Sequence, residues 1–319
     1  MNLLRHRWLL PMATAVILTA LWLGAGMRYD NLLSVRVFSN LLGNNAVIGV
    51  AAVGMTFVLL AGGIDLSVGA VVAFTSIFIA SQMRGGMGAS AVMAAALAIG
   101  TVFGALQGLM IQGYRLPAFL VTLGGMFLMR GLAFMVSEES IAITSPLYSA
   151  LQERGIPLAA GVQLPLTAVL FLGVIALGAL VAHGTRFGRN VYALGGSEPS
   201  ALLMGLPVAR VRVAVYALSG FCAALAGAAL TVQSGAGNAT NSQGLELEAI
   251  SAAVIGGTLL SGGRGYIVGT LLGVLVAGLI RTVINFAGNV PAAWQSIAVG
   301  GLLLAFILLQ KLIARRAPV

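Results

Sequence analysis

Charged residues are scarce in this sequence of 319 residues. They make up only 8% of the chain and apolar residues make up 59%, whereas about a quarter of a typical soluble domain is charged. This composition places the chain in the membrane class, so its length indicates one polytopic bundle rather than two soluble domains. The net charge of +9 sits at the ends of apolar runs and not on one face, which argues against nucleic-acid binding.

The residue types that carry most enzyme and metal chemistry are equally rare. Cys222 is the only cysteine and there are two histidines, which leaves no intrachain disulfide and little basis for a zinc site. Lys311 is the only lysine and follows Gln310, so the chain lacks the Walker A motif that holds the phosphates of ATP. It also has no HExxH pair and no evident nucleophile–base arrangement. We therefore expect no catalytic residue, no metal and no cofactor.

Long apolar runs make up most of the remainder. A helix needs about 20 such residues to cross the roughly 30 Å core of a bilayer. We expect an all-α polytopic membrane protein of about ten transmembrane helices, the first of which is not followed by a secretion-type cleavage site. The breaks near 62–66 and 261–265 are short, so the helices beside them could instead be broken or re-entrant. The expected spans are 8–27, 46–62, 67–83, 88–112, 116–136, 164–183, 212–233, 248–261, 266–284 and 292–310.

The distribution of basic residues predicts the orientation. With the N-terminus inside, far more arginine and lysine falls on the inner side than on the outer side, as the positive-inside rule requires. We therefore expect both termini in the cytoplasm. The inner set is Arg5, Arg7, Arg115, Arg186, Arg189, Arg210, Arg212, Arg264, Lys311, Arg315 and Arg316, and the outer set is Arg28, Arg36, Arg84 and Arg154.

One polar, basic stretch in the interior of the chain, from His183 to Arg212, interrupts the apolar pattern. Within it, Ser197 can cap a short helix, Pro199 suits its first turn and Gly205 can end it. An apolar tip on that helix could dock in a partner's groove or lie against the membrane surface. We interpret the chain as a single transmembrane domain, 1–319, with a first half (1–183), a cytoplasmic loop (184–211) and a second half (212–319).

The two halves contain a weakly similar motif. The segment Gly63-Ile64-Asp65-Leu66-Ser67 matches Gly244-Leu245-Glu246-Leu247-Glu248 in residue type at five positions. In the expected topology the two copies face opposite sides of the membrane, which is the mark of an inverted repeat. Helices 2–5 would then correspond to helices 7–10.

Glycines recur every fourth residue at Gly100, Gly104 and Gly108, which predicts a smooth helix face for packing inside the chain.

Charged and polar groups inside the apolar runs are the candidates for a transport pathway, because burying them is costly. Asp65 and Glu246 could gate the pathway or contact the solute, but each also resembles a helix cap. Arg130 and Arg281 could snorkel to the interface. A sugar pathway needs amides and aromatic rings, and the candidates for it are Gln107, Gln112, Gln233, Asn285, Trp294 and Gln295.

Three stretches resemble the membrane permeases of ribose/xylose-type ABC sugar importers: MTFVLLAGGIDLSVGAVVAF, RFGRNVYALGGSEPSALLMGL and LEAISAAVIGGTLLSGGRG. More narrowly, SEESI at 137–141 and INFAGN at 284–289 resemble a galactofuranose importer permease. The resemblance covers nearly the whole chain.

It implies a type II-like importer permease of ten helices in the bacterial inner membrane. The implied partners are a second, related permease in a heterodimer, cytoplasmic ATP-binding subunits and a periplasmic sugar-binding protein. The short loop helix would be the coupling helix that docks on the ATPase, although this loop lacks the Ala-Ala pair that follows the Glu in other importers. Its expected coupling residues are Ser197, Glu198, Ala201, Leu202, Leu203 and Gly205.

Two hypotheses follow. In the first, the chain is a passive subunit that carries a monosaccharide such as galactofuranose while a partner hydrolyses ATP. In the second, it is an ion-coupled secondary transporter that uses Asp65 and Glu246 as coupling acids.

Overall fold

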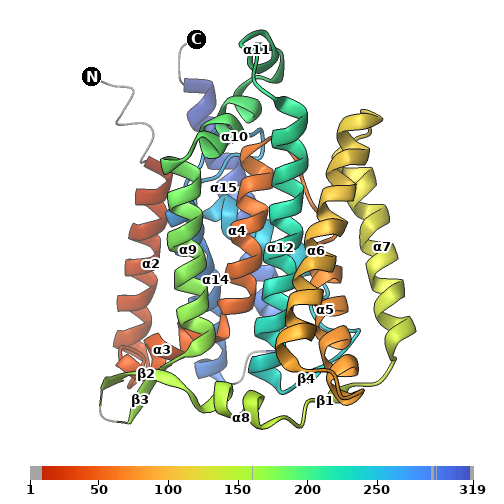
Figure 1. Cartoon of the computed structure of the whole chain (residues 1–319). Coiled ribbons are helices and arrows are strands. Elements are labelled where there is room, and N and C mark those ends of the chain that lie inside the picture. Colours follow the sequence, from red (N-terminus) through yellow and green to blue (C-terminus); the bar gives the residue numbers. More distant parts are fainter. Residues whose placement is uncertain (1–8, 160, 289–290, 292, 317–319) are drawn as a thin grey trace.

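The computed structural model describes residues 9–159, 161–288, 291 and 293–316, which form an upright bundle of helices (Figure 1). Two short antiparallel strand pairs, β1 with β4 and β2 with β3, lie at one end. The helices are α2 (Leu9–Arg28), α3 (Val35–Asn44), α4 (Ala46–Leu60), α5 (Val68–Arg84), α6 (Ala89–Gly113), α7 (Ala118–Val136), α8 (Pro146–Glu153), α9 (Leu166–Gly184), α10 (Arg186–Gly196), α11 (Glu198–Leu203), α12 (Val208–Ser234), α13 (Leu245–Ile255), α14 (Ile267–Ala287) and α15 (Ala293–Arg316), and the strands are β1 (Ile141–Ala142), β2 (Gly155–Ala159), β3 (Val162–Pro165) and β4 (Ala236–Gly237).

The helical membrane architecture expected from the apolar runs is present. Among the described residues, 7 helices are long and apolar enough to span a bilayer, namely α2, α6, α7, α9, α12, α14 and α15. The pair α3 and α4, bent by 54°, makes an eighth if it counts as one span. Ten were expected, and the difference lies in α5 and α13, which have only 17 and 11 residues. Both are shorter than the ~20 residues that a full crossing needs.

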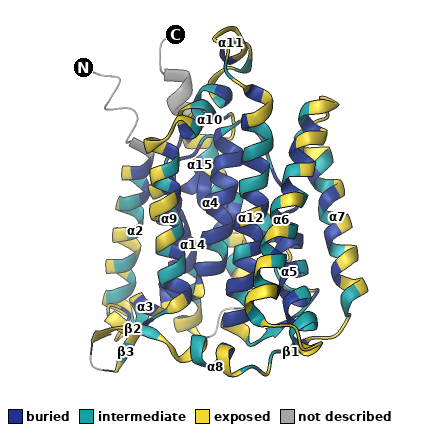
Figure 2. Cartoon of the chain, viewed as in Figure 1, coloured by how far each residue is buried: buried dark blue, intermediate teal, exposed yellow. Residues whose placement is uncertain are grey.

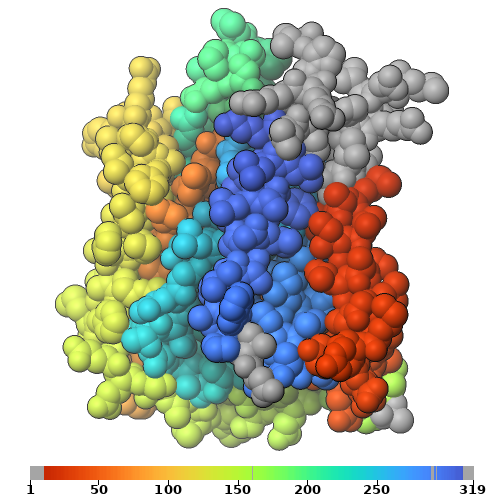
Figure 3. Space-filling view, turned by 180° about the vertical axis from the view of Figure 1, so that it is seen from behind, coloured from red at the N-terminus to blue at the C-terminus, as the bar shows by residue number. Residues whose placement is uncertain are grey.

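The centre of the bundle is formed by α4, surrounded by α9, α12, α13 and α14. Every residue of α4 except Ile48 is buried, as expected for a helix that is apolar on all sides. The outer helices α2, α7 and α9 instead carry exposed outer faces (Figure 2). Seen from behind, α15 runs along the middle of the opposite side, with α2 at one flank (Figure 3). These exposed faces are largely apolar, which suits contact with lipid.

The most extensive helix–helix contact is that of α6 with α12. A Cβ added at Gly100 would lie 2.6 Å from the Cβ of Ala224, and one at Gly104 would lie 2.9 Å from the carbonyl carbon of Tyr216. A Cβ at Gly108 would meet the α12 backbone at a similar distance. The predicted packing of the glycine face within the chain is therefore confirmed, because each glycine lets the two backbones approach.

The two breaks predicted near 62–66 and 261–265 lie side by side. The backbone N–H of Gly263 donates to the carbonyl of Leu60, the last residue of α4, at 2.9 Å. The second break is longer than expected, because α13 ends at Ile255 and not near 261. Gly257 adopts a φ of +96° there, and its left-handed conformation ends the helix in the way that glycine commonly does.

The first turn of α2 and the last turn of α15 lie at the end of the bundle that carries α10 and α11, whereas the strands and α8 lie at the other end (Figure 1). The chain termini themselves, 1–8 and 317–319, fall outside the described residues, and so do the predicted inner residues Arg5 and Arg7.

Candidate functional site

The short helix α11 projects from one end of the bundle (Figure 1). Its start is capped as predicted: the Ser197 hydroxyl accepts a hydrogen bond from the backbone N–H of Ser200 at 3.3 Å. At its end Gly205 has a φ of +73°, and its N–H bonds to the carbonyl of Leu202 while that of Leu206 bonds to the carbonyl of Ala201. This pair of bonds is a Schellman motif, which needs a left-handed residue at the glycine position. The helix predicted between Ser197 and Gly205 is present.

The apolar tip of α11 lies outside the bundle. Leu203 is 90% exposed, Met204 is 68% exposed and Leu202 is 56% exposed, whereas Ala201 is completely buried. The buried alanine faces the rest of the chain and the leucines face away. Large exposed apolar side chains at a polar end of a protein are typical of a contact surface.

An ion pair anchors the first turn of α11. The guanidinium of Arg212, on α12, lies 2.6 Å from the Glu198 carboxylate and donates a second hydrogen bond of 2.6 Å to the side-chain oxygen of Gln112 on α6. Gln112, which was a candidate for the sugar pathway, is therefore hydrogen-bonded to Arg212 near α11. Arg212 links three helices, so it restricts the direction in which α11 points.

Helix α10 was not predicted from the sequence. It lies beside α11 and packs on α9, α12 and α4. The hydroxyl of Thr185 caps it by accepting from the N–H of Gly188 at 3.1 Å, and Val191 and Leu194 face the core. A cap followed by apolar residues at helical spacing was the available signal. The hydroxyl of Tyr192 donates to the carbonyl of Gly265 at 2.8 Å, and burial raises the pKa of this phenol. α10 thus connects α11 to the second break.

Asp65 lies at the centre of a buried polar cluster. Its Oδ1 accepts from the backbone N–H and the hydroxyl of Ser67 at 2.9 and 2.7 Å, and its Oδ2 accepts from the hydroxyl of Ser219 at 2.7 Å. The Ser67 hydroxyl also lies 3.2 Å from the Gln107 oxygen. The structure therefore brings Asp65 and Gln107 together. Asp65 is not the N-cap of α5, since Ser67 holds that position, and its bond two residues onward is an Asx turn instead.

Glu246 lies in the first turn of α13 against the start of α5. A Cβ added at Gly69 would overlap its carboxylate, and its Oε2 is buried without a hydrogen-bond partner among the described residues. Arg130 donates to the carbonyls of Ala239 and Asn241 at 2.7 and 2.8 Å. Arg281 forms an ion pair of 2.6 Å with Glu248.

The remaining pathway candidates lie elsewhere. The side-chain amide of Gln295 donates to the Asn285 oxygen at 3.2 Å, which places both where α14 and α15 meet. Trp294 is 55% exposed. The six predicted residues therefore do not converge on one cavity. Among the described residues, no group of three or more His, Cys, Asp or Glu is placed to hold a metal.

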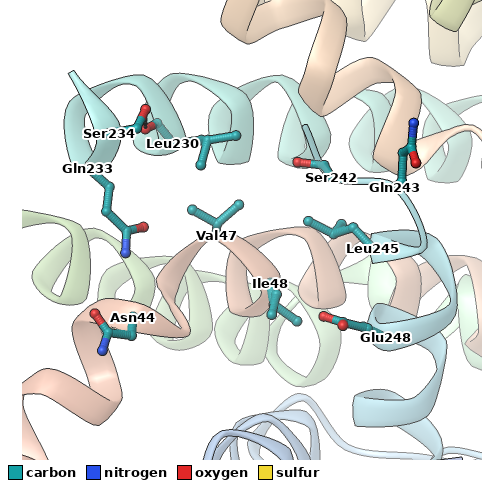
Figure 4. Close-up of a pocket in the computed structure, with 10 residues that line it drawn as sticks. All are labelled: Asn44, Val47, Ile48, Leu230, Gln233, Ser234, Ser242, Gln243, Leu245 and Glu248. Atoms are coloured by element: carbon teal, nitrogen blue, oxygen red, sulfur yellow. Dashed lines mark hydrogen bonds between the residues drawn. The ribbon is translucent and has the colours of Figure 1, made fainter. Parts of the chain in front are cut away.

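A pocket of about 460 Å³ is lined by the residues drawn in Figure 4. They come from the ends of α3, α4, α12 and α13 that lie away from α11 (Figure 1). The pocket is bounded by the bend between α3 and α4, by the last turn of α12 and by the start of α13. Of its lining, sequence reasoning had singled out only Gln233 as a pathway candidate. The lining residues are Asn44, Val47, Ile48, Leu230, Gln233, Ser234, Ser242, Gln243, Leu245 and Glu248.

Comparison with known proteins defines the class. Residues 37–307 match the family described as the permease component of branched-chain amino acid transport systems, and the chain belongs to this family of membrane permeases. It is 46% identical over 286 residues to the inner membrane ABC transporter permease protein YjfF of Escherichia coli, covering 89% of this chain and 86% of that protein. It is 36% identical over 312 residues to the fructose import permease protein FruG of Bifidobacterium longum, covering 96% of this chain and 92% of that protein. It is 35% identical over 312 residues to the ribose import permease protein RbsC of Escherichia coli, covering 95% and 94%.

Proposed function

We propose that this chain is the membrane-spanning subunit of an ATP-binding-cassette importer that moves a monosaccharide across the bacterial inner membrane. In this proposal a separate cytoplasmic subunit hydrolyses ATP, and the present chain performs no chemistry. The observation that carries the proposal is α11, an anchored helix whose apolar tip, with Leu203 at 90% exposure, points away from the bundle. A chain without a Walker A lysine needs a surface through which an external motor can act on it.

Three features support α11 as the coupling helix. Its exposed leucines can enter an apolar groove of a partner, whereas Arg212 and Ala201 hold the helix on the bundle. α10 continues from it to the two breaks, where Gly195 packs against the carbonyl of Leu60 and the N–H of Gly263. A displacement of α11 would therefore be transmitted through α10 to the two breaks between membrane helices.

The monosaccharide class is supported by the relatives, whose names specify import of ribose and of fructose. Galactofuranose is our specific proposal, because the SEESI and INFAGN segments resemble a permease for that sugar. By the same resemblance, the permease pairs with a second, related permease and receives sugar from a periplasmic binding protein.

We further propose ten membrane segments related by an inverted repeat within one domain, 1–319, with both termini in the cytoplasm. The ten segments are the eight spans counted by length together with α5 and α13, each of which crosses part of the membrane. Packing supports the symmetry, because α4 contacts α13 and α12 contacts α5 in corresponding pairs. The matched motifs also correspond: residues 63–67 lead into α5 and residues 244–248 open α13.

Reconstitution tests this function. The chain, purified with the subunits that accompany it, is placed in proteoliposomes with labelled D-galactose, D-ribose, D-fructose or L-leucine. We expect sugar uptake that requires ATP and persists in the presence of an uncoupler. Uptake without ATP, or purification without any ATP-binding subunit, contradicts the proposal and favours the ion-coupled alternative.

A further inference from the structure

We infer that the pocket between α4, α12 and α13 binds one neutral monosaccharide ring inside this single permease chain. This inference rests on the proposed function and adds to it the place and the chemistry of a sugar site. At about 460 Å³, the pocket has the size of a small-molecule site, for which about 300–1,000 Å³ is usual.

The polar lining is available to a ligand. Asn44, Gln233, Ser242 and Gln243 line the pocket, and within the described part of the chain none of their side chains hydrogen-bonds another protein group. Each amide offers two donors and an acceptor, and the serine hydroxyl offers both functions. Such groups match the hydroxyls of a sugar, each of which both donates and accepts a hydrogen bond.

The charge in the pocket favours an uncharged ligand. Glu248 is the one charged residue of the lining, and its Oε2 is paired with Arg281 at 2.6 Å. An amino acid would require unpaired charges of both signs for its ammonium and carboxylate groups. With its charge already neutralised, Glu248 can still accept a hydrogen bond at its other oxygen. The pocket therefore suits a polyol better than the amino acids that the family description mentions.

Apolar side chains complete the match. Val47, Ile48, Leu230 and Leu245 also line the pocket, and Figure 4 shows them between Asn44 and Gln233 on one side and Gln243 and Glu248 on the other. A sugar ring has polar edges and C–H faces, so it needs apolar contacts flanked by hydrogen-bonding groups.

The fold places this pocket on the side where a solute would arrive. α12 begins just after α11 and crosses the bundle before its last turn reaches the pocket, so the pocket and the coupling helix lie at opposite ends. In the proposed orientation that end faces the periplasm. Asn44, the last residue of α3, lines the pocket where α3 and α4 meet at a bend of 54°.

Cysteine labelling tests the site directly. Cys222, the only cysteine, is replaced by alanine, and Gln233→Cys is introduced into the complete importer in lipid nanodiscs. A membrane-impermeant maleimide is added with D-galactose, D-ribose, D-fructose or L-leucine. We expect a transported sugar to slow labelling at least threefold and L-leucine to leave the rate unchanged. Ser90→Cys, exposed in the first turn of α6 and outside the pocket lining, is the control and should show no protection.

Uptake by pocket variants provides a second measurement. Gln233→Leu and Ser242→Ala should each raise the sugar concentration for half-maximal uptake about fivefold, the effect of one lost hydrogen bond of about 1 kcal/mol, with ATPase activity unchanged. Ser90→Ala, the same change at an exposed serine outside the pocket lining, should leave both values unchanged. If a complex still imports sugar but the sugar does not protect Gln233→Cys from labelling, the sugar site is contradicted and the proposed function is not. A complex that imports none of these sugars contradicts the proposed function instead.

Discussion

Ser219 on α12 donates a hydrogen bond of 2.7 Å to the Oδ2 of Asp65, which lies in the break between α4 and α5. The two residues belong to opposite halves of the chain, so this bond ties the first break to the first long helix of the second half. Asp65 is 1% exposed and all its bonds are to neutral donors. These hydrogen bonds therefore give Asp65 a structural role between the two halves of the chain.

Replacement of Asp65 by asparagine separates the two transport hypotheses. Asparagine keeps one acceptor oxygen and the size of the side chain but cannot carry a proton, so we expect ATP-driven uptake within about threefold of the original. Asp65→Ala should lower stability in detergent by about 2–3 kcal/mol, because the buried Ser67 and Ser219 donors lose their acceptor. Thermal unfolding and uptake are measured for both variants. A well-folded Asp65→Asn protein without uptake would favour proton coupling.

Leu203→Asp tests the docking role of α11. At 90% exposure this residue contributes little to folding, so the variant should insert normally. Burial of a leucine against a partner stabilises the contact by about 1.5–3 kcal/mol. We therefore expect sugar uptake to fall at least tenfold and ATP hydrolysis to become uncoupled from sugar uptake. Leu158→Asp, partly exposed at the opposite end, is the control. Normal uptake by the Leu203 variant would count against coupling through α11.

The Glu198–Arg212 pair should orient α11 more than it stabilises the protein. Both side chains are partly exposed, and exposed ion pairs contribute only about 0–1 kcal/mol to folding. Glu198→Gln and Arg212→Gln should each reduce the sugar imported per ATP, and the double variant should be no worse than Arg212→Gln alone. A double-mutant cycle on this ratio measures the coupling, with Arg210→Gln as the neighbouring control. Additive effects would mean that the pair does not act as a unit.

Gly104→Ala should disrupt the contact between α6 and α12. The new methyl group meets the carbonyl group of Tyr216, and overpacking of this kind costs about 1–3 kcal/mol. Gly113→Ala, on the same helix with open space around it, should be neutral or slightly stabilising because alanine favours helix. Unfolding of the two variants in mixed detergent micelles gives the comparison. Equal stability would show that the helices separate readily at this point.

Local patterns were sufficient for some of these features. The apolar runs predicted the long helices, and the serine cap, proline and glycine around α11 predicted its position, because each signal involves neighbouring residues. Helix α10 was not predicted, although Thr185 caps its start. The span expected to end near 261 in fact ends at Ile255, where successive glycines end the helix.

The chain's own composition and spacing determined that it is a membrane bundle with a polar loop, because a long apolar run has to be buried in lipid or protein wherever it lies. Only the tertiary structure decided which polar groups meet. Ser219 donates to Asp65 and Ser67 links Asp65 to Gln107, whereas Gln295 donates to Asn285. The pocket brings Asn44 together with residues about 200 positions later in the chain. Such meetings depend on how helices bend and pack, which local sequence patterns do not encode.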